Sequence, residues 1–447
     1  MIKMKRVLVC GAGMVAGPHI RYLLDHGFHV VVASRTLGKA EALIGGHSNG
    51  VAEKFDITVD VEKLDPLVQD CDLAVSLLPY IYHVQVAKVC LKYNKHMVTT
   101  SYVSPEMRAL DTEARAAGVI FLNEIGVDPG IDHMSAQQII DRVHDQGGKV
   151  LSFKSYCGGL PAPEANTNPW GYKLSWSPRG VILAGRNAAK YKEDGDIIHI
   201  AGEDLFDKNL PYPIDGVEGE YEAYPNRDSI PYIDVYRIPE AETIFRGTIR
   251  NAGWSRALKK VAEIGYMEIE DQEFPSGFTY AALTARLLGV KDFSRVKEEF
   301  IKRFNLDPED DIVKRFEWMG LWDDEIPLPA SKISPLDALC AQWEKHLQYE
   351  ENERDMLLLI HEFEYELPSG KERLTATMVN LGYQDKGGDS SMSRTVGYPA
   401  SVAVRLILEG IITDIGVHIP VKRSIYEPIL AELKEMGIGF NEKTEKM

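Results

Sequence analysis

The sequence lacks the features that would place a 447-residue chain among membrane, secreted or metal-binding proteins. Its five cysteines are widely scattered and form no CxxC pair, which is typical of a reducing compartment. No apolar run approaches the ~18 residues that span a bilayer, and the apolar start, MIKMKRVLVC, is too short for a signal peptide. The twelve histidines show no metal-ligand spacing. We therefore expect a soluble, cytoplasmic protein without a metal.

Acidic residues outnumber basic ones, 67 Asp and Glu against 50 Lys and Arg, so the formal net charge is −17. Such a surface repels nucleic-acid backbones and anionic membranes, so neither is expected as a partner. Apolar residues make up 45% and charged residues 26%, as in an ordinary soluble globular protein. A chain of this length exceeds one hydrophobic core, so we expect two or three domains. A local group of arginines could still bind an anionic small molecule.

Short apolar runs alternate with helical patterns over the first 130 residues. Strands are predicted at Arg6–Cys10, His29–Ser34, Asp72–Leu78, His96–Ser101 and Val119–Ile125, and helices at Val15–His26, Val84–Lys92 and Pro105–Ala117. Alternation on this scale indicates βαβ units. The predicted fold class is therefore α/β, with a doubly wound parallel sheet at the N-terminal end.

The pattern changes after Gly147-Gly148. Strands are predicted at Val150–Tyr156, Ile197–Ile200 and Tyr232–Ile238, a β-hairpin at Asp355–Leu367 and Arg373–Leu381, and a further helix at Ala400–Leu408. Residues 255–350 are helical in pattern. These features indicate a mixed α/β region that contains a helical insertion.

A glycine-rich turn follows the first predicted strand directly. Gly11-Ala12-Gly13-Met14-Val15-Ala16 fits G-x-G-x-x-G/A, a turn whose backbone amides and helix dipole bind a pyrophosphate. The end of the second strand, Ala33-Ser34-Arg35-Thr36, has no acid for the ribose hydroxyl of NAD. Arg35 could bind the 2′-phosphate of NADP, unless it is only a solvated surface charge. The sequence therefore predicts a dinucleotide site that favours NADP.

Polar segments follow three of the predicted strands at one edge of the sheet. They are Leu77–Tyr80, Thr99–Tyr102 and Asn123–Asp128. Ligands bind at this edge in open α/β sheets, so the carboxylates of Glu124, Asp128 and Asp132 should line the cofactor site. Asp132 is as consistent with a helix cap as with a catalyst. Asp128 lies between two apolar residues, where partial desolvation would suit it to acid/base catalysis.

Cys157 and three arginines are further candidates. Cys157 lies where a predicted strand meets Gly158-Gly159; a lone cysteine is usually an inert core residue, although a thiol here could exchange protons. Arg227, Arg246 and Arg250 lie in otherwise uncharged segments. Their guanidinium groups suit carboxylate ligands, but surface ion pairs would use the same residues. His133 is interpreted as a helix-start residue and not as a metal ligand.

Together these segments resemble the saccharopine reductase family, the glutamate-forming saccharopine dehydrogenases. The resemblance rests on TTSYVSPEM, NEIGVDPGIDHM, SYCGGLPAPE, GYKLSWSPRGV, AYPNRDS and RGTIR, which follow the family's order and cover nearly the whole chain. It implies a Rossmann domain at residues 1–130, completed by about 390–447. It also implies a mixed α/β substrate domain at 131–254 and 351–389 and an inserted helical domain at 255–350.

The resemblance further implies a homodimer and reversible, NADP-linked chemistry in lysine metabolism. Saccharopine would be interconverted with L-glutamate and 2-aminoadipate 6-semialdehyde through an imine. Because saccharopine carries three carboxylates, it would explain arginines in the binding site of an acidic protein. The proton transfers would need groups that titrate near neutrality, and a desolvated Asp128 and the thiol of Cys157 are expected to be such groups.

The resemblance assigns three groups of site residues. Cofactor contacts fall on Gly11, Gly13, Met14, Ser34, Arg35, Asp56, Leu77, Thr99, Gly126, Val127, Asp128 and Trp176. Substrate contacts fall on Thr100, Ser101, Val127, Arg227, Thr248, Ile249 and Arg250. Acid/base roles fall on Tyr102, Asp128 and Cys157. Trp170 and Leu174 depart from the family's Leu and Phe, and because both are expected to border the site, they should affect substrate fit.

Two other functions fit parts of the sequence. An enzyme like carboxynorspermidine synthase would perform the same reductive condensation with a diamine and aspartate semialdehyde. It would need an acidic partner for the extra ammonium, whereas Arg227 and Arg250 favour carboxylates. A non-enzymatic NADPH-binding sensor is the second alternative, but it would not need Tyr102, Asp128 and Cys157 together.

Overall fold

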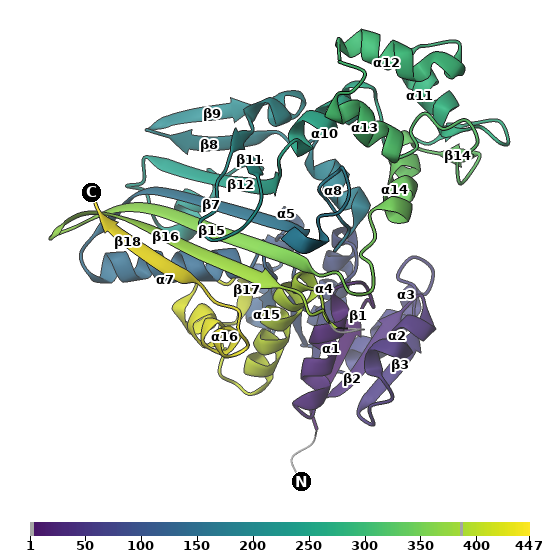
Figure 1. Cartoon of the computed structure of the whole chain (residues 1–447). Coiled ribbons are helices and arrows are strands. Elements are labelled where there is room, and N and C mark those ends of the chain that lie inside the picture. Colours follow the sequence, from purple (N-terminus) through teal and green to yellow (C-terminus); the bar gives the residue numbers. More distant parts are fainter. Residues whose placement is uncertain (1–3, 385–387) are drawn as a thin grey trace.

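Two large β-sheets organise the chain in the computed structural model, which describes residues 4–384 and 388–447 (Figure 1). The first sheet has the order β17-β6-β5-β4-β1-β2-β3, and all its neighbouring strands are parallel. Its strands are β1 (Arg6–Cys10), β2 (His29–Ser34), β3 (Gly50–Lys54), β4 (Leu73–Ser76), β5 (His96–Thr99), β6 (Ile120–Leu122) and β17 (Gly416–His418).

Helices cover both faces of this parallel sheet. One face carries α1 (Ala16–Asp25), α2 (Leu37–Ile44), α15 (Ser391–Leu408) and α16 (Arg423–Glu435). The other carries α3 (Val61–Gln69), α4 (His83–Lys92), α5 (Pro105–Arg108) and α6 (Asp111–Ala116), with the short helix η1 (Tyr80–Tyr82) before α4. Strands buried on both faces contain continuous apolar runs, as VLVC in β1 and VVVA in β2 show. The predicted doubly wound sheet is confirmed.

The second sheet is mixed and has the order β10-β11-β12-β7-β15-β16-β18, with β8 paired to β12 and β9 paired to β8. Strands β7 and β12 are parallel, and the other pairs are antiparallel. Its strands are β7 (Lys149–Pro161), β8 (Ala189–Glu193), β9 (Asp196–Ile200), β10 (Leu210–Pro211), β11 (Tyr221–Pro225), β12 (Thr243–Asn251), β15 (Asp355–Leu367), β16 (Gly370–Leu381) and β18 (Asn441–Lys446).

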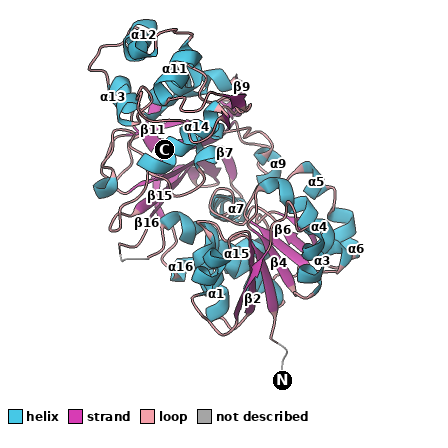
Figure 2. Ribbon diagram, turned by 90° about the vertical axis from the view of Figure 1, so that its right-hand side faces the viewer, coloured by secondary structure: helices cyan, strands magenta, loops and turns pink. Residues whose placement is uncertain are grey.

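Helices pack on both faces of the mixed sheet as well. The face toward the first sheet carries α7 (Ile131–Asp145) and α9 (Tyr232–Tyr236), as the turned view in Figure 2 shows for α7. The inserted region, green in Figure 1, contains α10 (Trp254–Glu263), α11 (Tyr280–Leu288), α12 (Val296–Phe304), α13 (Asp311–Trp318), α14 (Pro335–His346), η4 (Phe293–Arg295) and the two-stranded sheet of β13 (Gln272–Glu273) and β14 (Lys332–Ile333). Its apolar side chains share one core with α8 (Pro178–Ala184), η2 (Pro163–Ala165) and η3 (Gly202–Lys208).

The strand predicted at Tyr232–Ile238 is wrong, because the segment forms the helix α9. Its run of β-branched and aromatic residues imitates a strand. Pro231, however, adopts helical dihedrals immediately before it, and Arg237 closes the turn in the left-handed conformation at φ 57°. Tyr236 then packs edge-on against Phe153, so the apolar side chains fill the core between α7 and the mixed sheet.

The C-terminal segment returns to the first sheet, as the predicted fold class requires. Strand β17 pairs with β6, and α15 packs against α1, where the His19 ring lies 3.3 Å from the carbonyl oxygen of Gly397. The last strand does not follow, since β18 pairs with β16 in the mixed sheet. The expectation that residues 390–447 complete the Rossmann domain therefore needs this correction. No described helix is long and apolar enough to cross a membrane.

Candidate functional site

The glycine turn after β1 has the geometry of a phosphate-binding loop. Gly11 has φ +118°, and a Cβ atom there would lie 2.9 Å from the carbonyl oxygen of Leu77, so only glycine fits. At Gly13 no atom lies within 4 Å of such a Cβ, which leaves space beside the backbone. Helix α1 follows with no side-chain cap and no acidic residue in its first turn. Its N-terminus therefore remains available to a pyrophosphate.

The predicted NADP-selecting residues lie together at the ends of β2 and β3. Hydrogen bonds from the Thr58 backbone and hydroxyl hold the pKa of Asp56 below its usual value, and the nearby charge of Arg35 contributes to this. Arg35 is exposed one residue after Ser34, and Met14 of the glycine turn is 59% exposed. These residues fit a bound dinucleotide; the reading of a 2′-phosphate by Arg35 stays a prediction.

The buried side chain of His83 connects residues at the ends of β4 and β5. The sequence analysis did not select this histidine. His83 Nδ1 lies 2.8 Å from the Ser76 hydroxyl, and Nε2 lies 2.8 Å from Ser101 Oγ and 3.2 Å from Thr99 Oγ1. Burial lowers the pKa of His83 to about 4, so the ring is neutral near pH 7. Thr99 is buried against this ring, and its cofactor contact stays a prediction. Thr100 and Ser101 follow it at the strand end.

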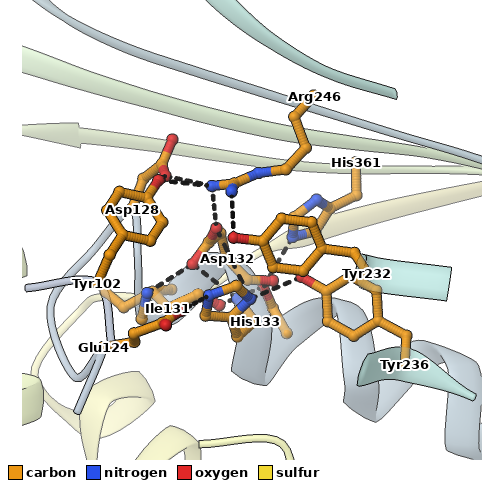
Figure 3. Close-up of polar contacts among 12 residues, drawn as sticks. Tyr102, Glu124, Asp128, Ile131, Asp132, His133, Tyr232, Tyr236, Arg246 and His361 are labelled. Carbon is orange, nitrogen blue, oxygen red and sulfur yellow. Dashed lines mark hydrogen bonds and ion pairs between the residues drawn. The ribbon is translucent and has the colours of Figure 1, made fainter. Parts of the chain in front are cut away.

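The three acids of NEIGVDPGIDHM lie just beyond the end of β6 (Figure 3). Glu124 is buried, and its backbone has φ 56°. Asp132 stands in the first turn of α7, where Oδ1 accepts the backbone N–H groups of Gly130 at 2.5 Å and His133 at 2.8 Å. The N-cap of α7 is Gly130 and no side chain caps this helix, so Asp132 lies within the first turn and the cap expected of it is not formed. The intervening Gly126-Val127-Asp128 loop is closed by a hydrogen bond from Gly126 N–H to the Pro129 carbonyl at 2.9 Å.

Arg246 of β12 joins these acids into one cluster (Figure 3). Its guanidinium donates to Asp128 Oδ1, to Asp132 Oδ2 at 2.9 Å and to the hydroxyls of Tyr232 at 2.8 Å and Tyr102 at 3.2 Å. The Tyr102 hydroxyl itself donates to Asp128 Oδ1 at 3.0 Å. Two of the predicted acid/base residues, Tyr102 and Asp128, are thus in direct contact. Arg246 pairs with buried carboxylates, so neither a surface ion pair nor a free ligand-binding arginine describes it.

His133 extends the cluster to Glu124. Its Nε2 lies 2.8 Å from Glu124 Oε2, and its Nδ1 lies 2.7 Å from the Tyr236 hydroxyl. Burial alone would lower the pKa of His133, but the charge of Asp132 and the hydrogen bond to Glu124 raise it above its ordinary value. Burial raises the pKa of Glu124, but the hydrogen bond and charge of His133, the Val103 backbone amide and the charge of Arg246 together hold it below its ordinary value. Each partner therefore favours the charged form of the other.

Cys157 lies in the middle of the mixed sheet, opposite Thr248 on β12 and Leu359 on β15. Burial raises the pKa of its thiol well above the ordinary value, and the charges of Asp128 and Asp132 raise it further. The expectation that Cys157 titrates near neutrality is therefore wrong: the thiol stays protonated. Its closeness to the predicted acid Asp128 nevertheless places it beside the carboxylate cluster.

The predicted substrate residues of β12 divide between the two faces of the strand. Side chains alternate along a strand, so Arg246, Thr248 and Arg250 start from one face and Ile249 from the other. Ile249 belongs to the core of the helical region and is fully buried, and its substrate contact stays a prediction. Arg250 is buried over the rings of Tyr172 and Trp254, each 5.4 Å from its guanidinium carbon.

Arg227 and Trp176 complete the predicted set at the mixed sheet. The Arg227 guanidinium carbon lies 5.0 Å from the centre of the Tyr102 ring, which connects it to the carboxylate cluster. Trp176 is partly buried and packs closely against Gly180 at the start of α8. These neighbours do not show whether Trp176 contacts the cofactor, so this contact stays a prediction.

Trp170 does not border the site, contrary to the prediction. Its indole N–H donates to the carbonyl oxygen of Arg315 at 2.9 Å, and its ring stacks on Phe316 of α13. The side chain is fully buried in the core of the helical region, where Leu174 is also buried. Trp170 therefore attaches the helical region to the mixed sheet.

Searches against known proteins give a consistent picture. Residues 7–122 match the family model described as the saccharopine dehydrogenase NADP binding domain, and residues 126–438 match the saccharopine dehydrogenase C-terminal domain. The chain is 43% identical to a saccharopine dehydrogenase [NADP(+), L-glutamate-forming] of Schizosaccharomyces pombe, over 98% of this chain and 99% of that protein. An alpha-aminoadipic semialdehyde synthase of Arabidopsis thaliana is 37% identical over all of this chain and 45% of its own length.

A solved structure is similar over the whole fold. The apo saccharopine dehydrogenase (L-Glu forming) from Saccharomyces cerevisiae superposes with a TM-score of 0.88 at 42% identity. The match covers 99% of this chain and 100% of that chain. Both sheets and the inserted helices therefore belong to one shared architecture.

Proposed function

We propose that this chain, which belongs to the saccharopine dehydrogenase family, interconverts saccharopine with L-glutamate and 2-aminoadipate 6-semialdehyde. The reaction is NADP-dependent, reversible and proceeds through an imine, in lysine metabolism. The names of the relatives support this activity, and so does the fit of the glycine turn to a dinucleotide.

The observation that carries the proposal is a buried cation without an acidic partner. Arg250 is 6% exposed, yet no carboxylate pairs with it in residues 4–384 and 388–447. One Nη donates to the Ile249 carbonyl at 2.8 Å, and Nε has no partner. Burying an unpaired charge is costly, so an anionic ligand is expected to complete this site. The carboxylates of saccharopine supply such an anion, with Arg227 as a second receptor.

The chain's own groups account for the proton transfers. Asp128 accepts and returns the proton of the substrate nitrogen, and Tyr102 holds the carboxylate through its hydroxyl. Cys157 acts as a neutral hydrogen-bond donor, since its thiol stays protonated. Bound NADP supplies the hydride acceptor, and the protein contributes placement and charge. The remaining cofactor and substrate contacts are proposed at the residues that the family resemblance assigns.

The deciding experiment measures NADP reduction by purified protein with saccharopine as the only substrate. We expect turnover to glutamate and the semialdehyde. In the reverse direction, NADPH oxidation is measured with glutamate plus 2-aminoadipate 6-semialdehyde and with a diamine plus aspartate semialdehyde. Faster turnover of the diamine pair would favour a carboxynorspermidine synthase-like enzyme. NADPH binding without turnover of either pair would favour a sensor.

We also propose that the protein is cytoplasmic and forms a homodimer. All five cysteines are free thiols, which supports a cytoplasmic location. The homodimer rests on the family resemblance alone, and sedimentation velocity at several protein concentrations tests it.

A further inference from the structure

Three hydroxyl groups at the ends of β4 and β5 converge on the ring of His83. Ser76 is the last residue of β4 and Thr99 the last of β5, and the two are paired in the parallel register. Ser101 follows two residues after Thr99, and its hydroxyl lies as close to the ring as that of Ser76, at 2.8 Å. One buried histidine therefore connects two strands at the edge of the sheet where ligands bind.

Packing alone does not account for a histidine at this position. The other buried residues of α4 are Val86, Ala87 and Cys90, and an apolar side chain would also fill the place of His83. It would avoid the cost of burying two polar nitrogen atoms. Both nitrogens of His83 instead face hydroxyls, and no carboxylate among the residues that the structure describes contacts the ring. The ring is therefore a neutral connector between polar side chains.

The surrounding hydroxyls determine which ring nitrogen carries the proton. A neutral imidazole has one N–H donor and one acceptor. Ser76 is fully buried, and within residues 4–384 and 388–447 its hydroxyl has only His83 Nδ1 as a partner. With the proton on Nε2, Ser76 donates to Nδ1, and only the buried hydrogen of Thr99 lacks an acceptor. With the proton on Nδ1, the nearer Ser101 would occupy Nε2, and the buried hydrogens of Ser76 and Thr99 would both be left over. Unmade hydrogen bonds of buried groups are costly, so the proton belongs on Nε2.

This arrangement leaves the hydrogen of the Ser101 hydroxyl free. Nε2–H donates to the Ser101 oxygen, so the Ser101 O–H is not used by the ring. The Ser101 backbone carbonyl accepts the N–H of Glu124 at 3.1 Å, which fixes the residue to the loop after β6. Ser101 is also only partly buried, unlike Ser76 and Thr99. It is therefore a preoriented hydrogen-bond donor for an oxygen atom of a ligand.

The charge next to Ser101 favours a carboxylate as the acceptor. Tyr102 follows Ser101 directly, and the guanidinium carbon of Arg227 lies 5.0 Å from the centre of the Tyr102 ring. Arg227 forms no ion pair with an acid in the described part of the chain, so its charge is available to an anionic ligand. A carboxylate beside Tyr102 would meet this cation, and a neutral O–H donor from Ser101 would complete its hydrogen bonding.

We propose that His83 is a positioning residue, whose Nε2–H holds the Ser101 hydroxyl as a hydrogen-bond donor to a carboxylate of the substrate. The inference rests on the proposed function and deepens it, since it gives a role in substrate binding to a residue that does not touch the substrate. Ser76 is a second positioning residue, because its O–H fixes the tautomer of the ring. The relay moves no proton, so it acts on substrate affinity and leaves the chemical step unchanged.

The first test compares two amide substitutions of the histidine. The side-chain nitrogen of glutamine lies near the place of Nε2 and can still donate to Ser101, whereas that of asparagine lies near Nδ1 and cannot. His83→Asn should raise KM for saccharopine by about fivefold or more, with kcat within about twofold of wild type. His83→Gln should recover most of this loss, and the Kd for NADPH should stay unchanged in both variants. Equal increases in KM for the two variants, or a weaker binding of NADPH with an unchanged KM, would overturn the inference.

The second test asks whether His83 acts through Ser101. If it does, His83→Asn has little left to remove once Ser101 is alanine, and the double variant should match the KM of Ser101→Ala within about twofold. Effects of the two substitutions that multiply would show that His83 acts by another route, and the inference would be wrong. Calorimetric titration of the NADP-loaded variants with saccharopine repeats the comparison without turnover.

Ser76→Ala tests the tautomer, and it decides alone if the histidine variants fail to fold. Without the Ser76 hydroxyl the proton is no longer fixed on Nε2, so KM for saccharopine should rise by about threefold, although Ser76 is fully buried. The matched control is Ser401→Ala, because Ser401 is also fully buried and its hydroxyl donates to the Gly397 carbonyl at 3.0 Å within α15. A KM for Ser76→Ala no higher than that of the control would contradict the relay. Absence of any saccharopine oxidation by the wild type would instead contradict the proposed function.

Discussion

At the scale of single residues, Arg35 tests the choice of cofactor. A charge-assisted contact to the 2′-phosphate contributes about 1.5–3 kcal/mol, or roughly 10- to 150-fold in affinity. Arg35→Ala should weaken NADPH binding by that factor and leave NADH binding nearly unchanged, as fluorescence titration can measure. Equal losses for both cofactors would mean that Arg35 shapes the loop beside Asp56 instead of contacting the phosphate.

Substitution of Arg250 tests whether this residue binds the substrate. Lysine keeps the charge but cannot reproduce the planar guanidinium that lies over Tyr172 and Trp254. Arg250→Lys should raise KM for saccharopine by about tenfold or more and leave NADPH affinity unchanged. Arg256→Lys is the control, since Arg256 pairs with Asp310 on the surface of the helical region. A KM within about twofold of wild type would remove Arg250 from the substrate site.

Cys157 gives a prediction that depends on pH. Because its pKa is raised, the reactive thiolate is scarce at pH 8 and increases as the pH rises. Alkylation of Cys157 by iodoacetamide at pH 8 should be at least about tenfold slower than that of glutathione, and should still be accelerating at pH 10. Peptide mass spectrometry measures the rate, with Cys157→Ser as the blank. A rate that levels off near pH 8 would contradict the raised pKa.

The sequence identified the residues of the site better than it identified the contacts between them. Tyr102, Asp128 and Arg227 could be selected from the sequence and do lie together. The role of Arg246 could not, because RGTIR contains no sign that its first arginine meets acids from a segment more than a hundred residues earlier. The alternation of Arg246, Thr248 and Arg250 along one strand face was the available signal, and it required β12 to be recognised as a strand.

At the scale of elements, the glycine turn makes the sharpest prediction. A Cβ at Gly11 would meet the carbonyl oxygen that follows β4, at a backbone φ that other residues rarely adopt. Gly11→Ala should raise the Kd for NADPH by at least about tenfold in a protein that still folds. Gly38→Ala is the control, because a Cβ there has no neighbour within 4 Å. Equal affinities for the two variants would show that the turn does not hold the pyrophosphate.

The elements were predictable where one physical signal dominated. Strands β1, β2, β4, β5 and β6 of the parallel sheet and the long β15–β16 hairpin follow from apolar patterns and were predicted, whereas β3, β17, α2 and α3 were not. Helix α9 was missed, because its strand-like composition is overruled by the turn at Pro231 and by packing on Phe153. Trp170 was misplaced because the sequence does not reveal that its ring enters the helical region.

At the scale of the whole molecule, the His133–Glu124 pair should make stability depend on pH. The pKa of His133 is raised from 6.5, so its stabilisation is full below pH 6.5 and is lost as the pH rises through the folded value. The pKa of Glu124 is lowered from 4.5, so its stabilisation is full above pH 4.5 and is lost as the pH falls through the folded value. Both contributions are complete between pH 4.5 and 6.5.

The measurement is the difference in melting temperature between wild type and His133→Gln across pH. We expect the difference to be largest between pH 4.5 and 6.5 and to shrink at higher pH. A difference that is constant from pH 5 to pH 9 would mean that the ring contributes only by packing and neutral hydrogen bonds.

The position of the last elements also has a consequence for biosynthesis. Helix α15 covers one face of the parallel sheet, β17 forms its edge beside β6, and β18 closes the edge of the mixed sheet beside β16. A ribosome makes all three after every other strand of both sheets. The part of that face that awaits α15 thus remains uncovered while some 270 residues, from β6 to α15, are translated, although α1 and α2 of the same face are already made. Neither sheet can reach its finished form during translation, and a chaperone has that whole interval in which to engage the uncovered face.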